Sequence, residues 1–329
     1  MGEGKVMELV PRRRLELFSG RSHPGLAHEI ADNLGVALGE ANLHDFADGQ
    51  IHCRYDASIR GSDVFIIQPH SHPVNDSIME QLIMIDAAKR ASAHRITAVC
   101  PYYGYSRQDR KSTGREPITA KLIADLLTAA GADRVVSVDL HSGQIQGFFN
   151  FPVDHLTALP VLCSYLAEQD PRKLAIVSPD AGRVKVAERF SQQLGADLAF
   201  VHKRHLTSKA NSVEAREVIG IVKGRVCVII DDLIDTGGTI LGAAERLRDA
   251  GATDVWAMAT HAVLSEPALE RLRGDTISRV IVTNTLPLPK ERLIDKIEVL
   301  SVAPLIAAAI DAVFEDTSVS GIFGGNNLS

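Results

Sequence analysis

Three aspartates crowd beside a glycine turn in the stretch VCVIIDDLIDTGGTI, residues 226–240. Gly237 and Gly238 let the backbone take positive φ and approach a ligand closely. The helix expected to follow presents unpaired N–H groups and the positive end of its dipole, and Thr236 and Thr239 add hydroxyl donors. This combination predicts a loop that binds a phosphate without the help of a lysine.

The aspartates must serve another part of the ligand. Ionised carboxylates only accept hydrogen bonds, so the natural partners of Asp231 and Asp232 are hydroxyl groups and divalent cations. A sugar phosphate such as ribose 5-phosphate has a phosphate at one end and vicinal hydroxyls a short distance away, so it suits both features. An ordinary aspartate-rich turn between a strand and a helix is the alternative interpretation.

Other polar residues follow apolar runs elsewhere in the chain. His141, Asp180 and Lys203 each end such a run, and Arg107 and Gln108 follow another. In open parallel sheets, ligands bind at the carboxyl ends of the strands. Any one of these residues alone is typical of a solvated turn, but together they predict a ligand crevice along one edge of a sheet.

The elements that position these residues alternate along the chain. Amphipathic, helix-like segments separate short β-branched runs that are nearly continuous in apolar residues, which is typical of parallel strands covered by helices. We expect strands over residues 64–68, 96–103, 134–141, 173–180, 198–203, 225–231, 254–261 and 279–285. The polar segment 204–216 lacks apolar periodicity and is expected to be a mobile loop.

These strands are too many for one compact sheet, and the stretch FFNFPVDHL, residues 148–156, is the best candidate for a seam. The expected fold is therefore α/β, with two mainly parallel sheets flanked by helices. The expected parts are a flexible tail at 1–13, an N-terminal domain at 14–155, a C-terminal domain at 156–303, and a helix and strand at 304–323 that return to the N-terminal domain.

Composition narrows the class of protein. The 329 residues carry a net charge of -6, so no global basic field attracts nucleic acid or a membrane. The four cysteines lack metal-binding or redox spacing, and Cys100 and Cys227 lie within apolar runs, so buried free thiols are expected. Neither a leader nor an apolar run of bilayer length is evident. These features predict a cytoplasmic protein.

Further segments extend the pattern beyond the aspartate–glycine motif. They are FADGQ (46–50), SIRG (58–61), PVNDSIMEQLIMIDAAKRASA (73–93), PYYGYSRQDRK (101–111), REPITAKL (115–122), DLHSGQIQGFF (139–149), SPDAG (178–182), THAVLS (260–265), VTNTLPL (282–288) and SVSGIF (318–323). With them the chain resembles, over roughly residues 14–323, the ribose-phosphate pyrophosphokinase family, most closely its phosphate-activated, ADP-inhibited class. The resemblance implies two tandem domains of the phosphoribosyltransferase type.

The resemblance also implies an activity and its residues. Such enzymes transfer the pyrophosphoryl group of Mg-ATP to the 1-hydroxyl of ribose 5-phosphate, giving AMP and 5-phosphoribosyl 1-pyrophosphate for nucleotide, histidine and tryptophan biosynthesis. Asp231 and Asp232 match the positions that hold the ribose hydroxyls. The other implied residues are Asp235, Thr236, Gly237, Gly238 and Thr239 for the 5-phosphate, Phe46, Asp48, Gln50, Arg107 and Gln108 for ATP, and His141 and Asp180 for Mg²⁺.

Assembly and regulation are implied as well. The FADGQ loop matches a loop that completes a neighbouring subunit's ATP site, which implies a homo-oligomer, in this family a hexamer. Ser58, Arg60, Ser318 and Ser320 match positions lining a site between subunits, where inorganic phosphate activates and ADP inhibits.

Three positions depart from the family's pattern. Gln50 replaces the usual Glu and can still make hydrogen bonds to a nucleotide. Arg183 stands where many relatives have Gly, and it either reaches the ATP phosphates or faces solvent. The family's Lys-x-Arg is here Lys203, Arg204 and His205, so Arg204 or His205 serves as the second catalytic cation beside Lys203. We expect Arg204, because its fork of donors suits phosphate oxygens.

Two other functions stay open at this point. A nucleobase phosphoribosyltransferase would need the phosphate loop but no ATP loop, and a non-catalytic paralogue would regulate an active synthetase by assembling with it. The complete DDLIDTGGT motif, together with Lys203, His141 and Asp180, favours the active synthetase.

Overall fold

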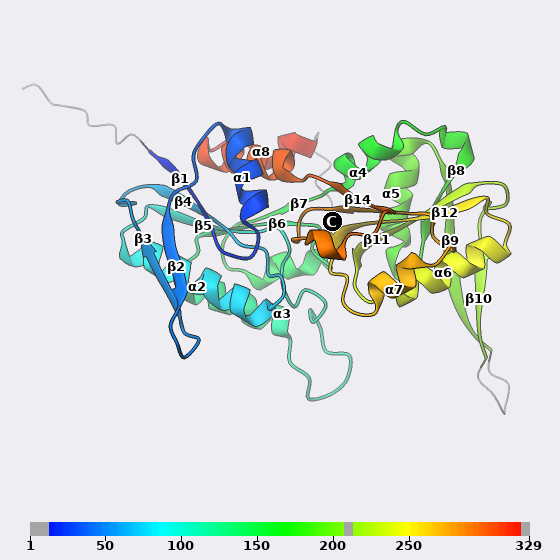
Figure 1. Ribbon diagram of the computed structural model, residues 1–329, viewed down its shortest axis with the longest axis horizontal. Helices are drawn as coiled ribbons and strands as arrows, with labels where there is room; N and C mark the ends of the chain where they lie inside the picture. Colours follow the sequence, from blue (N-terminus) through cyan, green and yellow to red (C-terminus); the bar gives the residue numbers. More distant parts are fainter. Residues whose placement is uncertain (1–12, 207–212, 324–329) are drawn as a thin grey trace, which may run out of the picture.

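Two mainly parallel sheets make up the fold (Figure 1). The computed structural model describes residues 13–206 and 213–323, and of residues 203–206, 213–216, 292 and 323 it describes the backbone alone. The first sheet is parallel throughout, in the order β1 (Leu15–Ser19), β4 (Asp63–Ile67), β5 (Arg95–Cys100), β6 (Arg134–Val138) and β7 (Val153–Leu156).

The second sheet is parallel except for the pair β9–β10 at one edge. Its order is β10 (Val213–Ile219), β9 (Asp197–Leu206), β8 (Leu174–Ser178), β11 (Val226–Ile234), β12 (Asp254–Ala262), β13 (Arg279–Thr283) and β14 (Ile297–Leu300). All the strands expected from apolar runs are present, and the predicted α/β fold with two mainly parallel sheets is confirmed.

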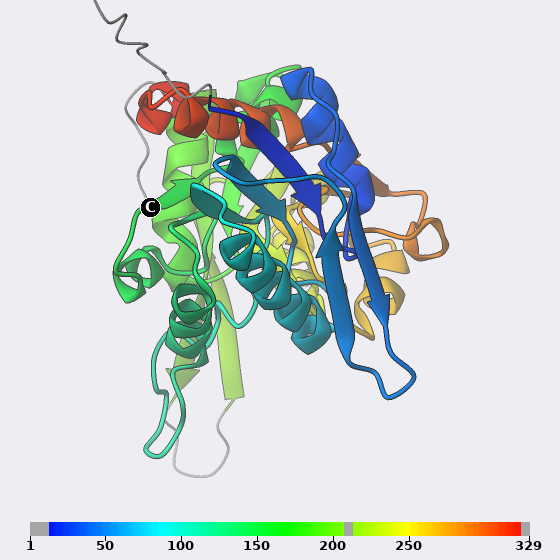
Figure 2. The ribbon, with the colours of Figure 1, turned by 90° about the vertical axis from the view of Figure 1, so that its left-hand side faces the viewer.

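A projecting hairpin was not expected from the sequence. It consists of β2 (Ala41–Asp45) and β3 (Ile51–Tyr55), which pair antiparallel and extend away from the first sheet (Figure 2). Most residues of both strands are half-buried or exposed, so neither strand requires an apolar run, and neither has one. Hydrophobic periodicity therefore could not reveal them.

Helices cover both sheets on both sides (Figure 1). One side holds α1 (Pro24–Leu34), α8 (Ala303–Phe314), α4 (Leu159–Leu166) and α5 (Val184–Leu194), and the other holds α2 (Val74–Arg90), α3 (Thr119–Ala130), α6 (Gly238–Asp249) and α7 (Ala268–Arg273). On the first side one apolar core is continuous, from Leu17 and Phe65 of the first sheet to Trp256 of the second. This shared core fixes how the carboxyl edges of the two sheets face each other.

The C-terminal segment differs from the expected strand. After α8, which packs on α1, residues Val319–Phe323 form a 3₁₀ helix. The N–H of Gly321 donates to the carbonyl of Ser318 at 3.2 Å, and Val319 is buried in the core beside α8. The local turn already pairs a backbone group and buries the apolar side chain, so the segment gains little from joining a sheet edge.

The two described ends of the polar segment 204–216 are strands, where a loop was expected. β9 continues to Leu206, β10 begins at Val213, and the two strands pair with Arg204 opposite Ala215. Backbone pairing at a sheet edge does not require apolar side chains, so the sequence pattern gave no sign of it. Residues 207–212 lie outside the described part of the chain, as do residues 1–12 of the expected tail.

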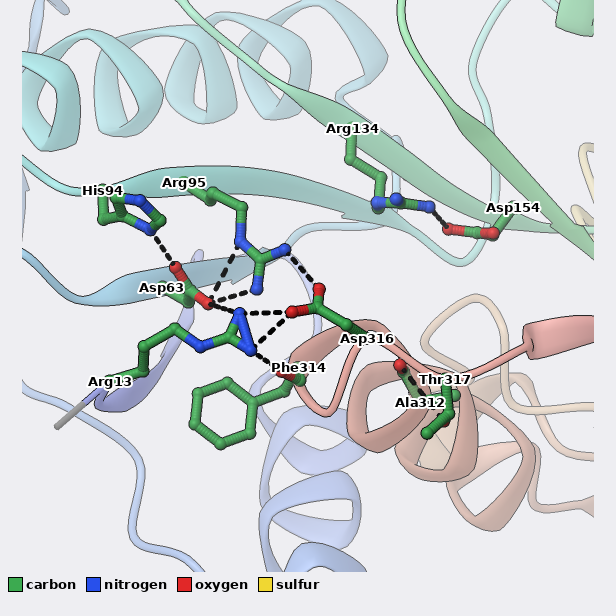
Figure 3. A network of polar contacts seen from close by, with 10 residues as sticks. All are labelled: Arg13, Asp63, His94, Arg95, Arg134, Asp154, Ala312, Phe314, Asp316 and Thr317. Atoms are coloured by element: carbon green, nitrogen blue, oxygen red, sulfur yellow. Dashed lines mark hydrogen bonds and ion pairs between the residues drawn. The ribbon is translucent and has the colours of Figure 1, made fainter. Parts of the chain in front are cut away.

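Arg13, the last residue of the expected tail, joins an ion-pair network (Figure 3). Arg13 lies 2.6 Å from Asp316, just after α8, and Asp316 also pairs with Arg95 at 2.8 Å. The Asp63 carboxylate is only 2% exposed and accepts hydrogen bonds from Arg95 at 2.5 Å and His94 at 2.9 Å. Burial opposes ionisation of Asp63, but Arg95 and His94 outweigh it and lower the pKa.

We expect Asp63→Asn to lower the free energy of unfolding by about 2 kcal/mol. Breaking a buried ion pair costs ~3–5 kcal/mol, and partial exposure of the arginine partners reduces that figure. The measurement is urea unfolding at fixed protein concentration. Asp86→Asn, which removes an exposed pair with Arg90, is the matched control and should change stability by less than ~0.5 kcal/mol.

The pH dependence of this difference distinguishes ion pairing from packing. The pKa of Asp63 is lower in the folded chain than its ordinary value. Its contribution is therefore complete above the unfolded pKa of about 4 and is lost as the pH falls through the folded pKa. A difference between wild type and Asp63→Asn that stays constant at acid pH would contradict the ion-pair explanation.

Candidate active site

The carboxyl ends of strands from both sheets meet around a cavity of about 190 Å³. Its wall contains Arg107 after β5, His141 after β6, Asp180 and Arg183 after β8, and the end of β11 with its following turn, residues 231–240. The first sheet supplies Arg107 and His141, and the second supplies the rest. The phosphate loop and the aspartate pair thus share one cavity, as a ligand with both phosphate and hydroxyl groups requires.

The turn after β11 has the backbone of an anion-binding loop. Gly237 has a φ of 73°, and α6 begins at the next residue, Gly238. The first N–H groups of this helix have no partner within the helix, so they can donate to an anion held by the loop. Arg271 of α7 donates from Nη1 to the carbonyl of Thr236 at 2.8 Å. A Cβ at Gly238 would lie 3.3 Å from the same Nη1. Arg271 therefore supports the loop, and no local sequence signal marked it.

Asp231 and Asp232 form a buried carboxylate pair near the end of β11. Their side chains are 16% and 9% exposed, and the N–H of Asp232 donates to Oδ1 of Asp231 at 2.9 Å. Burial raises the pKa of Asp231, and the neighbouring Asp232 adds to this shift. Burial opposes ionisation of Asp232 too, but the hydrogen bond with His141 and the charge of Arg183 outweigh it and lower the pKa.

Arg183 faces the aspartate pair, and the alternative that it points to solvent is wrong. Its Nη2 lies 2.7 Å from Oδ1 of Asp232 and 2.6 Å from Nδ1 of His141. Its Nε lies 3.5 Å from Oδ1 of Asp231, and Nη1 donates to the carbonyl of His141 at 3.3 Å. The guanidinium thus joins residues from the ends of β6, β8 and β11.

The loop that carries His141 is held by contacts from β12 of the second sheet and from the segment after β7. Asp139 begins this loop with a φ of 38°, a left-handed conformation that Asp tolerates better than most residues. Its Oδ2 accepts hydrogen bonds from Oγ1 of Thr260 at 2.6 Å and from the N–H of Ala158 at 2.9 Å. The buried ring of His261 approaches the carbonyl of Asp139 at 3.1 Å. Thr260 and His261 lie in THAVLS, so the sequence marked the segment but not its role.

The two expected ATP-binding segments lie in different places. Arg107 lines the cavity and pairs with Asp235 of the phosphate loop at 2.6 Å, whereas Gln108 accepts a hydrogen bond from Thr119 at the start of α3. Phe46 is 52% exposed in the turn of the β2–β3 hairpin, and that turn also contains Asp48 and Gln50, neither of which lines the cavity. The structure brings Arg107 to the phosphate loop but keeps the hairpin turn apart from the cavity within one chain.

The remaining expected residues belong to β9 and to the segments before β4 and after α8. The backbones of Lys203, Arg204 and His205 belong to β9, and their side chains lie outside the described part of the structure. The candidate regulatory residues are exposed, with Ser58 and Arg60 before β4 and Ser318 and Ser320 after α8.

The donor set of the cavity fits Mg²⁺ as a shared ligand. Among the described residues, no group of three or more His, Cys, Asp or Glu side chains is placed to hold a metal by itself. His141, Asp180 and Asp232 nevertheless bring a ring nitrogen and carboxylate oxygens to one wall. Mg²⁺ is commonly bound by one or two carboxylates, with water and substrate oxygens completing its coordination.

Comparisons with known proteins cover nearly the whole chain. Residues 15–131 match the family model for the N-terminal domain of ribose phosphate pyrophosphokinase, and residues 207–324 match the phosphoribosyl synthetase-associated domain. The ribose-phosphate pyrophosphokinase of Streptomyces coelicolor is 57% identical over 94% of this chain and 96% of its own length. That of Bifidobacterium longum is 54% identical over 97% of this chain and 95% of its own length.

A solved structure agrees with these matches. The crystal structure of phosphoribosylpyrophosphate synthetase from Mycobacterium smegmatis superposes with a TM-score of 0.87 and 52% identity, covering 92% of this chain and all of that one. Its similarity extends across both sheets, which confirms two domains of the phosphoribosyltransferase type. The chain therefore belongs to the ribose-phosphate pyrophosphokinase family of enzymes.

Proposed function

We propose that this chain transfers the pyrophosphoryl group of Mg-ATP to the 1-hydroxyl of ribose 5-phosphate, giving 5-phosphoribosyl 1-pyrophosphate and AMP. The observation that supports this most directly is the single cavity that combines a phosphate loop, a buried aspartate pair and Arg107. The loop suits the 5-phosphate, the aspartates suit the ribose hydroxyls, and Arg107 supplies a cation for a second, phosphate-bearing substrate.

In this mechanism the protein mainly positions groups and balances charge. The N–H groups after Gly237 hold the 5-phosphate, while Asp231 and Asp232 accept hydrogen bonds from the ribose hydroxyls, so the sugar is anchored at two points. The 1-hydroxyl oxygen forms a bond to the β-phosphorus of ATP, the bond from that phosphorus to the α-phosphate oxygen breaks, and the hydroxyl proton passes to solvent. Charge on the transferred group is then stabilised by Lys203 and a second cation beside it.

Magnesium is the cofactor that the cavity suits, and ATP is a co-substrate. His141 and Asp180 would hold the ion, which supplies positive charge against the phosphate oxygens when bound. This chain's own contribution is to present those two side chains from the ends of β6 and β8, with the loop of His141 fixed by Asp139.

One assay tests the activity. Purified protein is supplied with Mg-ATP and ribose 5-phosphate, and AMP and 5-phosphoribosyl 1-pyrophosphate are measured together. Equal amounts of the two products are expected. Pyrophosphate release from 5-phosphoribosyl 1-pyrophosphate and a nucleobase, without AMP formation from ATP, would favour a nucleobase phosphoribosyltransferase. Ribose 5-phosphate binding without either reaction would favour a regulatory paralogue.

The protein acts as a homo-oligomer, most simply a hexamer, in this proposal. Phe46, Asp48 and Gln50 lie in the turn of the projecting β2–β3 hairpin, outside the cavity of their own chain (Figure 2). Rings of His44, Phe46 and His52 pack together near this turn, with Phe46 and His52 centroids 5.7 Å apart. A neighbouring subunit would receive this turn at its ATP site. Light scattering of the active protein tests the assembly, and an active monomer would rule it out.

Inorganic phosphate is expected to activate the enzyme and ADP to inhibit it. Ser58 and Arg60 line a separate cavity of about 320 Å³, and their carbonyls accept hydrogen bonds from Arg14 at 3.1 and 3.3 Å. The preceding residue, Arg13, pairs with Asp316, two residues before Ser318. The two candidate regulatory segments are therefore linked through consecutive arginines. The measurement is the rate of AMP formation at fixed free Mg²⁺, and identical rates with and without phosphate would contradict this regulation.

A cytoplasmic location completes the proposal. Cys53 is half-buried and the other three cysteines are buried, all as free thiols, which suits a reducing compartment. In the described ranges, no helix has both the length and the apolar character needed to cross a bilayer. The net charge of -6 gives no support for nucleic-acid or membrane partners.

A further inference from the structure

Arg183 takes the place that a bound cation would take among the acidic groups of the cavity. Its guanidinium lies 2.7 Å from Asp232 and 2.6 Å from the His141 ring, and 3.5 Å from Asp231. The side chain is only 17% exposed, so water screens these contacts weakly. The positive charge of Arg183 thus already offsets part of the negative charge in the cavity where a sugar and a metal ion would be expected to bind.

The hydrogen bonds in this cluster cannot all form at once. Nδ1 of His141 lies 2.6 Å from Oδ2 of Asp232 and 2.6 Å from Nη2 of Arg183. A protonated Nδ1 donates to Asp232 but then faces another donor, and an unprotonated Nδ1 accepts from Arg183 but then faces a carboxylate oxygen. Either way one close contact lacks a hydrogen bond. These contacts hold the cluster together, but a ligand that gives His141 and Asp232 a partner each can displace the Arg183 side chain.

The position of Arg183 allows such a displacement. It is the last residue of the 3₁₀ turn Ala181–Arg183, directly before α5, and its neighbours Ala181 and Gly182 are exposed. Its side chain also lines a second cavity of about 130 Å³, which shares His141 and the aspartate pair with the first. A change of side-chain rotamer between the two cavities would free the carboxylates without moving the backbone.

We propose that Arg183 is an internal counterion that competes with divalent cations for the donor set of the cavity, His141, Asp180 and Asp232. The inference rests on the proposed function for the identity of the ligands that displace it. A divalent cation alone must replace Arg183 at the cost of its ion pairs, so it binds weakly. A cation that arrives with phosphate-bearing substrates gives the displaced guanidinium new anionic partners, so the metal and the substrates bind cooperatively.

The test is Mn²⁺ binding to the protein without substrates, measured by electron paramagnetic resonance. Arg183→Met removes the charge but keeps an unbranched side chain, and we expect it to tighten Mn²⁺ binding at least about tenfold. Lys185→Met removes the same charge from an exposed position of α5 and should leave Mn²⁺ binding unchanged. Arg183→Lys retains a charge with fewer donors and should lie between wild type and Arg183→Met.

Two further measurements secure the interpretation. Adding His141→Ala to Arg183→Met should abolish the gain, because the gain requires the His141 site. Mn²⁺ should also raise the Tm of Arg183→Met more than that of wild type, since at a given concentration a ligand that binds the folded state more tightly stabilises it more. Wild-type Mn²⁺ affinity in a folded Arg183→Met would overturn the proposal. If Arg183→Met folds poorly, Arg183→Lys is measured instead, and Mn²⁺ binding to Arg183→Lys as weak as to wild type would then overturn it.

These outcomes are separable from failure of the proposed function. The binding assay contains neither ATP nor ribose 5-phosphate, so its result does not depend on turnover. Tighter Mn²⁺ binding in Arg183→Met with no AMP formed by wild type would refute the activity and retain the counterion. AMP formation by wild type with unchanged Mn²⁺ binding in Arg183→Met would support the activity and refute the counterion.

Discussion

Asp231→Asn is expected to weaken ribose 5-phosphate binding at least about 100-fold while leaving the chain folded. Burial raises the pKa of Asp231 in the free cavity, but two ribose hydroxyls that donate to the carboxylate favour its ionised form. Hydrogen bonds to a charged group contribute ~1.5–3 kcal/mol each, and loss of two such bonds from the ribose hydroxyls gives at least this change. The fold should persist because the closest ion pair of Asp231, with Arg183, is long, at 3.5 Å. Calorimetric titration with ribose 5-phosphate measures the effect. Asp231→Ala combined with Asp232→Ala should lose more affinity.

The neighbouring positions sharpen this test. Asp249→Asn, on the exposed side of α6, removes a charge without touching the cavity and should bind ribose 5-phosphate like wild type. Asp232→Asn should lose both affinity and stability, because Asp232 also holds Arg183 at 2.7 Å and His141 at 2.6 Å. Wild-type ribose 5-phosphate affinity in Asp231→Asn and in the double Ala variant would exclude a sugar site on this pair.

Lys203→Ala is expected to lower kcat by roughly 10²–10³-fold while KM for ribose 5-phosphate changes little. A cation that contacts the transferred group mainly in the transition state has effects of this size in comparable electrostatic sites. Steady-state AMP formation at saturating Mg-ATP measures both constants. A rise in KM for ribose 5-phosphate with kcat unchanged would place Lys203 in substrate binding rather than in catalysis.

The identity of the second cation, Arg204 or His205, depends on the conformation of the end of β9 when ATP is bound. The strand is extended through Leu206, and alternate positions of a strand lie on the same face, so positions 203 and 205 share a face and position 204 does not. Arg204 can act beside Lys203 only if this strand end opens when ATP binds. We expect that opening, so Arg204→Ala should be nearly as damaging as Lys203→Ala and His205→Ala mild. A larger loss of kcat in His205→Ala would show that the strand stays extended and that His205 is the second cation.

The sequence by itself determined the features whose physics is local. Gly237 and Gly238 allow the turn of the phosphate loop wherever the strand before them lies, and the apolar run 226–230 predicts that strand. Aspartates directly before such a turn would lie beside any phosphate that the turn binds, whatever the rest of the fold. Elements without a clear hydrophobic pattern could not be predicted in this way, as the polar β2–β3 hairpin and the 3₁₀ helix at Val319–Phe323 show.

Only the tertiary structure decided which charges meet. Arg183 lies on Asp232 across the ends of two neighbouring strands, and Arg107 reaches Asp235 from the other sheet. Arg271 supports the loop at Thr236 from a later helix. Local propensity describes each backbone segment separately, whereas an ion pair requires two distant segments to be brought within about 4 Å and shielded from water. That approach is set by the packing of two sheets around a shared core, which no single stretch of residues encodes.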